Sequence, residues 1–91
     1  MPLTGNQRKK LKSNAHHLKP IVQVGQKGLT ETLIKSVDEA LESRELIKIK
    51  FIEYKNEKKE LSVKIASETG AEVIGSIGNI VILYRKKKDK E

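Results

Sequence analysis

Two glycines enclose a polar and a cationic residue in the stretch VGQKGL, residues 24–29. Because Gly25 and Gly28 carry no Cβ, the backbone N–H groups between them can approach a ligand closely. An amphipathic pattern begins directly after the loop, and the first turn of a helix has free N–H groups that favour anions. We predict that this Gly-x-x-Gly loop binds a phosphate group, with Lys27 as the countercharge and Gln26 as a hydrogen-bonding residue. The alternative is a strand-to-helix turn in which the glycines meet only a backbone requirement.

The apolar spacing on either side of the loop predicts three helices and four strands. Leu33, Val37 and Leu41 recur at intervals of four, which is typical of a helix with one buried face. Residues 46–52 instead alternate between apolar and polar side chains, as in a half-buried strand. We predict helices at 4–18, 30–44 and 57–69, and strands at 21–24, 46–52, 73–77 and 80–84.

Local signals set the ends of these elements. Thr4 is a suitable N-cap for the first helix, and Pro20 excludes the residue before it from helical angles. Gly70 suits a left-handed cap at the end of the third helix. Gly78-Asn79 is typical of a two-residue hairpin, so the last two strands are predicted to pair antiparallel.

These elements predict an α/β fold of the two-layer α+β type, in the order αβαβαββ. Strand–helix–strand connections are right-handed and parallel in nearly all proteins, so the first three strands should run parallel, with the fourth reversed. Residues 80–83 read Ile-Val-Ile-Leu without polar alternation. This run favours a strand that is buried on both faces, in the interior of the sheet.

The composition narrows the class of protein. The 91 residues suffice for one domain, which we assign to residues 1–85, with a basic and disordered tail at 86–91. There is no cysteine, and therefore no disulfide or thiolate metal site. No apolar run approaches the roughly 20 residues of a membrane span, and residues 1–12 lack the apolar segment of a signal peptide. We predict a cytoplasmic protein without a cofactor or a metal.

Positive charge is concentrated at the N-terminal end of the chain. The formal net charge is +7, and residues 1–28 contain six Lys and Arg side chains but no acid. The first helix therefore lacks the intrahelical ion pairs that ordinarily stabilise an exposed face, and we predict that its charges stay unpaired. Its cations are predicted to form one surface with the flanking loop, suited to phosphates; a solvated helix face is the alternative. They are Arg8, Lys9, Lys10 and Lys12.

Two other patterns are predicted to be structural. The neighbouring His16 and His17 do not suggest a metal site, because adjacent residues on a helix point about 100° apart. One of them is expected to pack near the sheet. A second Gly-x-x-Gly, at residues 75–78, falls within a predicted strand and its hairpin and has no cation between its glycines. Spacing alone is therefore no evidence of a binding loop.

Several short motifs occur in a characteristic order: LTG at 3–5, QR at 7–8, AHHLKP at 15–20, VQVGQKGLT at 22–30, TGA at 69–71 and VILYR at 81–85. Together they closely resemble the CRM domain, named for chloroplast RNA splicing and ribosome maturation, in its stand-alone bacterial, YhbY-like form. The resemblance implies an RNA-binding fold similar to the C-terminal domain of bacterial translation initiation factor three, with a mixed sheet in the order 1-2-4-3. Because stand-alone members associate with precursors of the large ribosomal subunit, it also implies that role.

We therefore predict a monomeric RNA-binding protein that holds the backbone of structured RNA, above all ribosomal RNA. The few aromatic residues are not interleaved with basic ones, which indicates that shape and backbone contacts dominate over base stacking. The basic tail, from Arg85 onward, is predicted as either a solvated end or an auxiliary contact. The predicted RNA-binding residues are Gly25, Gln26, Lys27, Gly28, Arg8, Lys9, Lys12, Lys19, Thr30 and Arg85.

Other functions are weaker predictions. A protein-interaction module would use the acidic face of the second helix to dock a basic ribosomal protein. That face carries Glu31, Asp38, Glu39 and Glu42. An enzyme is disfavoured because the sequence has no thiol, no spaced histidine–carboxylate set and no Walker loop. A DNA-binding module is disfavoured because no recognition helix or A·T-reading arm is evident.

Overall fold

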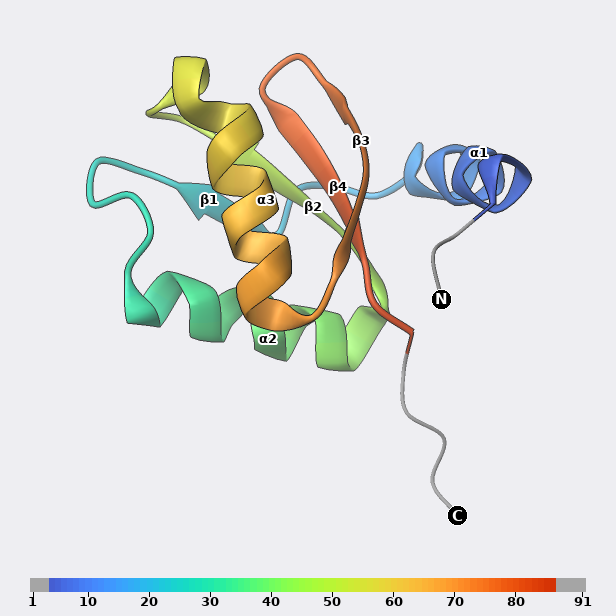
Figure 1. Cartoon of the computed structure of the whole chain (residues 1–91), viewed down its shortest axis with the longest axis horizontal. Helices are drawn as coiled ribbons and strands as arrows, with labels where there is room; N and C mark the ends of the chain where they lie inside the picture. Colours follow the sequence, from blue (N-terminus) through green and yellow to red (C-terminus); the bar gives the residue numbers. More distant parts are fainter. Residues whose placement is uncertain (1–3, 87–91) are drawn as a thin grey trace.

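The computed structural model describes residues 4–86, with three α-helices and four strands in the predicted order αβαβαββ (Figure 1). A short 3₁₀ helix, η1, precedes the third α-helix. The elements are α1 (Gly5–Ala15), β1 (Val22–Val24), α2 (Glu31–Arg44), β2 (Leu46–Phe51), η1 (Lys55–Glu57), α3 (Lys58–Thr69), β3 (Glu72–Ile77) and β4 (Ile80–Tyr84).

The four strands form one mixed sheet in the order β1-β2-β4-β3, as the resemblance implied. β1 pairs parallel with β2, and β4 pairs antiparallel with both of its neighbours. The prediction of an interior fourth strand is confirmed, because Val81, Ile82 and Leu83 are each at most 1% exposed. Alternate residues of a strand point to opposite faces, so β4 contributes side chains to a core on each side of the sheet.

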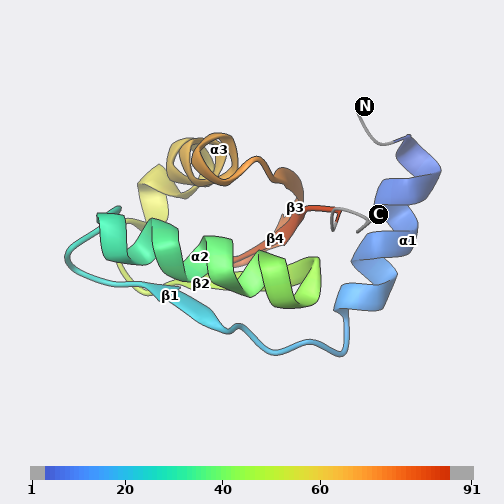
Figure 2. The same ribbon diagram turned by 90° about the horizontal axis from the view of Figure 1, so that it is seen from below.

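The main core lies between the sheet and the pair of helices α2 and α3 (Figure 2). Phe51 of β2, Leu41 of α2 and Ile65 of α3 are fully buried in it. On the other face of the sheet, Ala15 of α1 packs against Ile82 in a smaller cluster. Among the described residues, α1 covers only part of this face, because Gln23 and Lys50 on the same face are exposed.

Most of the predicted element ends are correct. Thr4 caps α1 as predicted, with its Oγ1 accepting a hydrogen bond from the Gln7 N–H at 3.2 Å. Gly70 ends α3 in the left-handed conformation, with φ of 69°. The predicted end of the first helix at residue 18 is wrong, because α1 ends at Ala15. The chain leaves the helix early because it must cross to the sheet, where the Ile21 N–H donates to the Lys48 carbonyl at 3.1 Å.

Both ends of the chain extend beyond this description. Of the predicted basic tail at 86–91, only Lys86 lies within the described residues, and 87–91 lie outside them. The assignment of residues 1–85 to a single domain stays a prediction. Within residues 4–86, no helix is long and apolar enough to cross a membrane.

Candidate nucleic-acid interface

The Gly-x-x-Gly loop is a tight turn between β1 and α2. The Gly28 N–H donates to the Gly25 carbonyl at 3.0 Å, and Gly28 has the positive φ of 66° that other residues rarely adopt. Gln26 and Lys27 at the tip are exposed, and their backbone N–H groups have no acceptor among residues 4–86. The loop thus presents two backbone donors and one cation to solvent.

A shallow groove of about 580 Å³ runs from the loop along the start of α2. Thr30 is the N-cap of α2, and its Oγ1 accepts the Leu33 N–H at 3.0 Å, so this hydroxyl is engaged in capping. Thr32 and Ser36 bring two further hydroxyls to the groove. The sequence prediction missed these two, although residues four apart on a helix share a face.

The cations of α1 differ in how much they are engaged. Lys9, Lys10 and Lys12 are exposed. The prediction of unpaired charge is wrong for Arg8, whose Nη1 donates to the Val73 carbonyl at 2.7 Å and whose Nη2 lies 3.4 Å from a carboxylate oxygen of Glu72. Counting acids within the helix missed this pair, because the partner comes from β3.

The open face of the sheet carries two lysines of β2 that were not predicted as site residues. In the strand register Gln23 lies opposite Lys50 and Lys48 opposite Ile82, which places both lysines on the α1 side of the sheet. The Lys48 ammonium donates to the Leu18 carbonyl at 3.0 Å, and Lys50 is exposed. The period-two alternation of β2 was the available signal, since it turns both lysines away from the core.

The Gly-x-x-Gly loop and α1 lie at opposite ends of the long axis of the molecule, which measures 38 Å (Figures 1 and 2). The prediction that the basic face of α1 flanks the loop is therefore wrong. The sheet lies between them: Lys48 and Lys50 of β2 are on its α1 face, Lys50 is opposite Gln23 of the strand that leads to the loop, and Lys12 of α1 lies beside β3. We refer to Lys12, Lys48, Lys50 and the loop as the basic route.

Arg85 is placed differently from the other predicted site residues. Its guanidinium lies 2.6 Å from Asp38 Oδ1 and 2.9 Å from Glu42 Oε2, and it also donates to the Thr69 carbonyl at 2.8 Å. Its side chain is only 19% exposed. The structure therefore gives Arg85 a structural role, joining the end of β4 to α2 and α3.

The two histidines and Lys19 lie in the connection between α1 and β1. His17 lies near the sheet, where it lines a pocket with Leu46 and Ile47 of β2, but neither histidine is buried. His17 and Lys19 line a shallow pocket of about 300 Å³ together with Arg44. This connection adds positive charge at the α1 end of the molecule, away from the loop.

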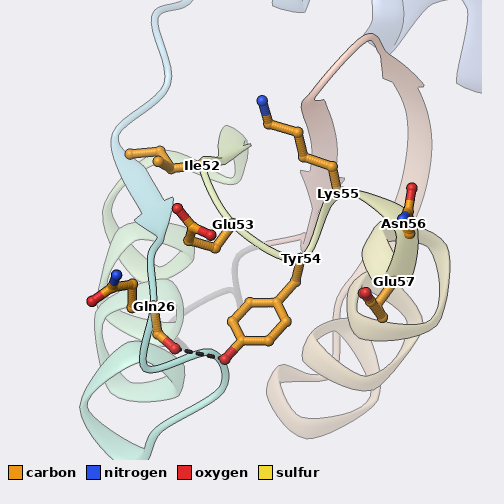
Figure 3. Close-up of a pocket in the computed structure, with 7 residues that line it drawn as sticks. All are labelled: Gln26, Ile52, Glu53, Tyr54, Lys55, Asn56 and Glu57. Atoms are coloured by element: carbon orange, nitrogen blue, oxygen red, sulfur yellow. Dashed lines mark hydrogen bonds between the residues drawn. The ribbon is translucent and has the colours of Figure 1, made fainter.

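A tyrosine that the sequence prediction gave no role supports the loop from behind. The Tyr54 hydroxyl donates to the Gln26 carbonyl at 2.6 Å (Figure 3). The ring also packs close to the loop, because a Cβ on Gly28 would lie 3.4 Å from it, at van der Waals contact. No sequence pattern marked this contact, because the two residues belong to different connections of the sheet.

The fold and the loop define a class of small α/β modules in which a Gly-x-x-Gly turn joins a strand to a helix. Within this class, the chain belongs to the CRS1 / YhbY (CRM) domain family, whose model matches residues 3–85. The resemblance seen in the motifs is thereby confirmed.

Curated relatives and a solved structure agree with this assignment. The chain is 38% identical to the probable RNA-binding protein YqeI of Bacillus subtilis, over 98% of this chain and 94% of that protein. It is 40% identical to an RNA-binding protein of Haemophilus influenzae, over 96% and 89% of the two chains. The solution structure of SAV1595 from Staphylococcus aureus superposes with a TM-score of 0.84 at 38% identity, covering 99% of this chain and 95% of that one.

Proposed function

We propose that this chain is an RNA-binding protein that holds the sugar–phosphate backbone of structured RNA. The observation that carries the proposal is the Gly-x-x-Gly loop, where two backbone N–H groups that have no acceptor among residues 4–86 lie beside the exposed Lys27. Donors and a cation suit a phosphate oxygen and recognise no particular base. The names of the relatives support the same class of ligand.

The basic route supports a folded RNA as the ligand. Its two ends are separated by most of a 38 Å axis, and a structured RNA can contact both ends while a short single strand contacts one. Lys9 and Lys19 would add contacts at the α1 end, where both are exposed. Neutralisation of about five phosphates would give a log–log salt slope between about −3.5, the single-strand value, and about −4.5, the duplex value.

We further propose ribosomal RNA of the large subunit as the ligand, bound by a cytoplasmic monomer without enzymatic activity. The support is the family membership, because the resemblance in the motifs implied an association with precursors of the large ribosomal subunit. Sedimentation with ribosomal subunits from a lysate tests it: the protein should migrate with large-subunit precursors and be released by high salt. Migration only at the top of the gradient would contradict the ribosomal role.

Docking of a basic protein on the acidic face of α2 receives less support. Asp38 and Glu42 of that face pair with Arg85. Glu31 and Glu39 remain as exposed acids on the same helix. The face therefore has less negative charge to offer than the sequence suggested.

The decisive experiment compares two double variants of equal charge change. Gln26→Asp/Lys27→Asp places two carboxylates at the tip of the loop, and Val63→Asp/Lys64→Asp makes the same change of three charges on the exposed face of α3. We expect the loop variant to lose at least about tenfold in affinity for a structured ribosomal RNA fragment, because each phosphate contact is salt-bridge-like and the loop would repel the backbone. Binding is measured across a salt series.

The α3 variant separates a local effect from a general loss of positive charge. It should bind RNA within a few-fold of the unmodified chain, and both variants should unfold at similar temperatures. If the two variants lose affinity equally, binding follows net charge and not the loop. If the loop variant binds as well as the unmodified chain, the proposed function of the loop is wrong.

A further inference from the structure

A shallow, open pocket of about 640 Å³ lies behind the Gly-x-x-Gly loop, and no predicted function accounts for it. One wall is the loop at Gln26, and the other is the segment 52–57 that follows β2. The N–H groups of Ile52 and Glu53 both donate to the Val24 carbonyl, at 2.9 and 3.2 Å. The segment is thus anchored to the strand that leads into the loop, so the two walls are held together.

Tyr54 sits in this pocket with a backbone conformation that is unfavourable for its residue type. Its φ of 57° and ψ of 39° are left-handed, which costs a non-glycine residue about 1–2 kcal/mol. The side chain is nevertheless a large aromatic ring, and the residue is 41% exposed. Strained backbone that is retained beside a binding loop is a recognised feature of ligand sites.

The charged side chains that line the pocket are two acids, Glu53 and Glu57, and one cation, Lys55. Glu53 and Glu57 lie on either side of Tyr54, while the Gln26 side chain points away from the ring (Figure 3). Within the described residues, the side chains of Glu53, Asn56 and Glu57 make no hydrogen bond or ion pair. Carboxylates beside an aromatic ring repel a phosphate but accept hydrogen bonds from the N–H groups of a flat heterocycle.

We propose that this pocket binds one unpaired nucleobase, stacked on Tyr54, from the RNA strand whose backbone the loop holds. The proposal rests on the proposed function and adds a base-reading subsite to it. Guanine is the best match, because its Watson–Crick edge offers two adjacent N–H donors to one carboxylate. Uracil is the poorest, because two carbonyl oxygens flank its single N–H. Unstacked bases in RNA are commonly bound in this way, by an aromatic ring and by contacts to their edges.

The pocket can be tested with the intrinsic fluorescence of Tyr54. The chain has no tryptophan and two tyrosines, so Tyr84→Phe leaves Tyr54 as the only emitter. The probe is a set of identical RNA hairpins with one unpaired position that carries guanine, adenine, cytosine, uracil or no base. We expect quenching of Tyr54 emission by the guanine RNA, and roughly tenfold weaker binding of the abasic RNA, since stacking of one base contributes about this much.

Two substitutions separate stacking from support of the loop. Tyr54→Phe keeps the ring but loses the hydroxyl, and should keep the preference for guanine. Tyr54→Asn removes the ring and suits the left-handed backbone, so the protein should fold and bind all five RNAs with the affinity of the abasic one. If Tyr54→Asn instead weakens binding of all five RNAs equally, the tyrosine only supports the loop and the base pocket is wrong.

The loop variant Gln26→Asp/Lys27→Asp distinguishes the two proposals. One outcome is that the loop variant loses all five RNAs, while the unmodified chain binds them equally and Tyr54 emission in Tyr84→Phe does not change. The loop then binds RNA, and the base pocket is wrong. If the loop variant retains all five RNAs with the preference for guanine intact, the pocket stands and the loop proposal fails. Loss in the loop variant together with a Tyr54-dependent preference supports both.

Discussion

The chain contains two Gly-x-x-Gly segments, at residues 25–28 and 75–78, and the structure gives them different environments. In the first, the pair between the glycines is at the exposed tip of a turn, with a helix directly behind it. In the second, residues 75–77 belong to β3, and the ladder to β4 holds them. A Cβ on Gly75 would lie 2.5 Å from the Lys12 side chain, so this glycine makes room for a neighbour within the protein.

The difference shows that glycine spacing defines a binding loop only together with its surroundings. At 25–28 the space around the first glycine is open, with no atom within 4 Å of an added Cβ. At 75–78 the corresponding space is filled by Lys12, and the second glycine serves a hairpin turn with φ of 57°. Within the described residues, the first segment therefore combines open space at its first glycine with two backbone N–H groups that have no acceptor.

The largest difference is expected when the last glycine of each segment is changed. Gly28→Ala and Gly78→Ala both force an L residue into a left-handed conformation, so each should lower the free energy of unfolding by about 1–2 kcal/mol. Gly28→Ala should also weaken RNA binding by about tenfold, because the left-handed backbone at Gly28 sets the shape of the loop. Chemical denaturation and RNA titration of both variants measure this. Equal RNA affinities for the two would remove the functional distinction between the segments.

A smaller effect is expected for the first glycine of the binding loop. Gly25→Ala meets no atom within 4 Å and has no positive φ, so stability should stay within about 0.5 kcal/mol of the unmodified chain. RNA affinity should fall several-fold, since the added Cβ would stand where the RNA backbone approaches. Gly5→Ala, which is also open, is the matched control and should leave RNA affinity unchanged. Unchanged affinity in Gly25→Ala would argue against close approach at the loop.

The same contrast between an open and an occupied site applies to cations. Lys27 is exposed, whereas Arg85 contacts Asp38, Glu42 and the Thr69 carbonyl. Arg85→Ala should lower the free energy of unfolding by about 1 kcal/mol, because both acids are largely exposed and such pairs contribute little. RNA affinity should change less than twofold. A large loss of affinity at unchanged stability would support the sequence prediction that Arg85 contacts RNA.

The smallest effect is expected for the first glycine of the structural segment. In Gly75→Ala the new Cβ meets the far end of the flexible Lys12 side chain, which can move aside, so the stability loss should be below about 1 kcal/mol. Any change in RNA affinity would then reflect the displaced Lys12 side chain. A twofold decrease or less, with a slightly shallower salt slope, fits one displaced cation of the basic route. A tenfold loss would make this segment as important as the loop and would overturn the comparison.

Local sequence signals predicted most of the fold and the position of the Gly-x-x-Gly loop between a strand and a helix. The Thr4 cap, the Gly70 cap and the buried run of β4 each depend on residues that are neighbours in sequence, and each is confirmed. The errors arose where contacts join distant segments. The partners of Arg8 and Arg85 come from other elements, 64 and 47 residues away.

The position of α1 and the role of Tyr54 were missed for the same reason. The sequence of α1 does not indicate which end of the sheet the helix covers, because Leu11 and Ala15 can pack against any apolar surface of complementary shape. The contact between Tyr54 and Gln26 spans 28 residues. A sequence pattern indicates which residues share a face of one helix or strand, but tertiary packing determines which faces contact one another.

The strand order of the sheet determines which backbone edges are available for pairing with another copy of the protein. β1 and β3 are the edge strands, and an exposed edge invites a strand from another molecule to pair with it. β1 has only three residues, and β3 is interrupted by an irregularity between Val73 and Gly75. The Arg8 guanidinium also donates a hydrogen bond to the Val73 carbonyl of β3. Both edges are therefore poor templates for intermolecular pairing, which favours resistance to aggregation at high concentration.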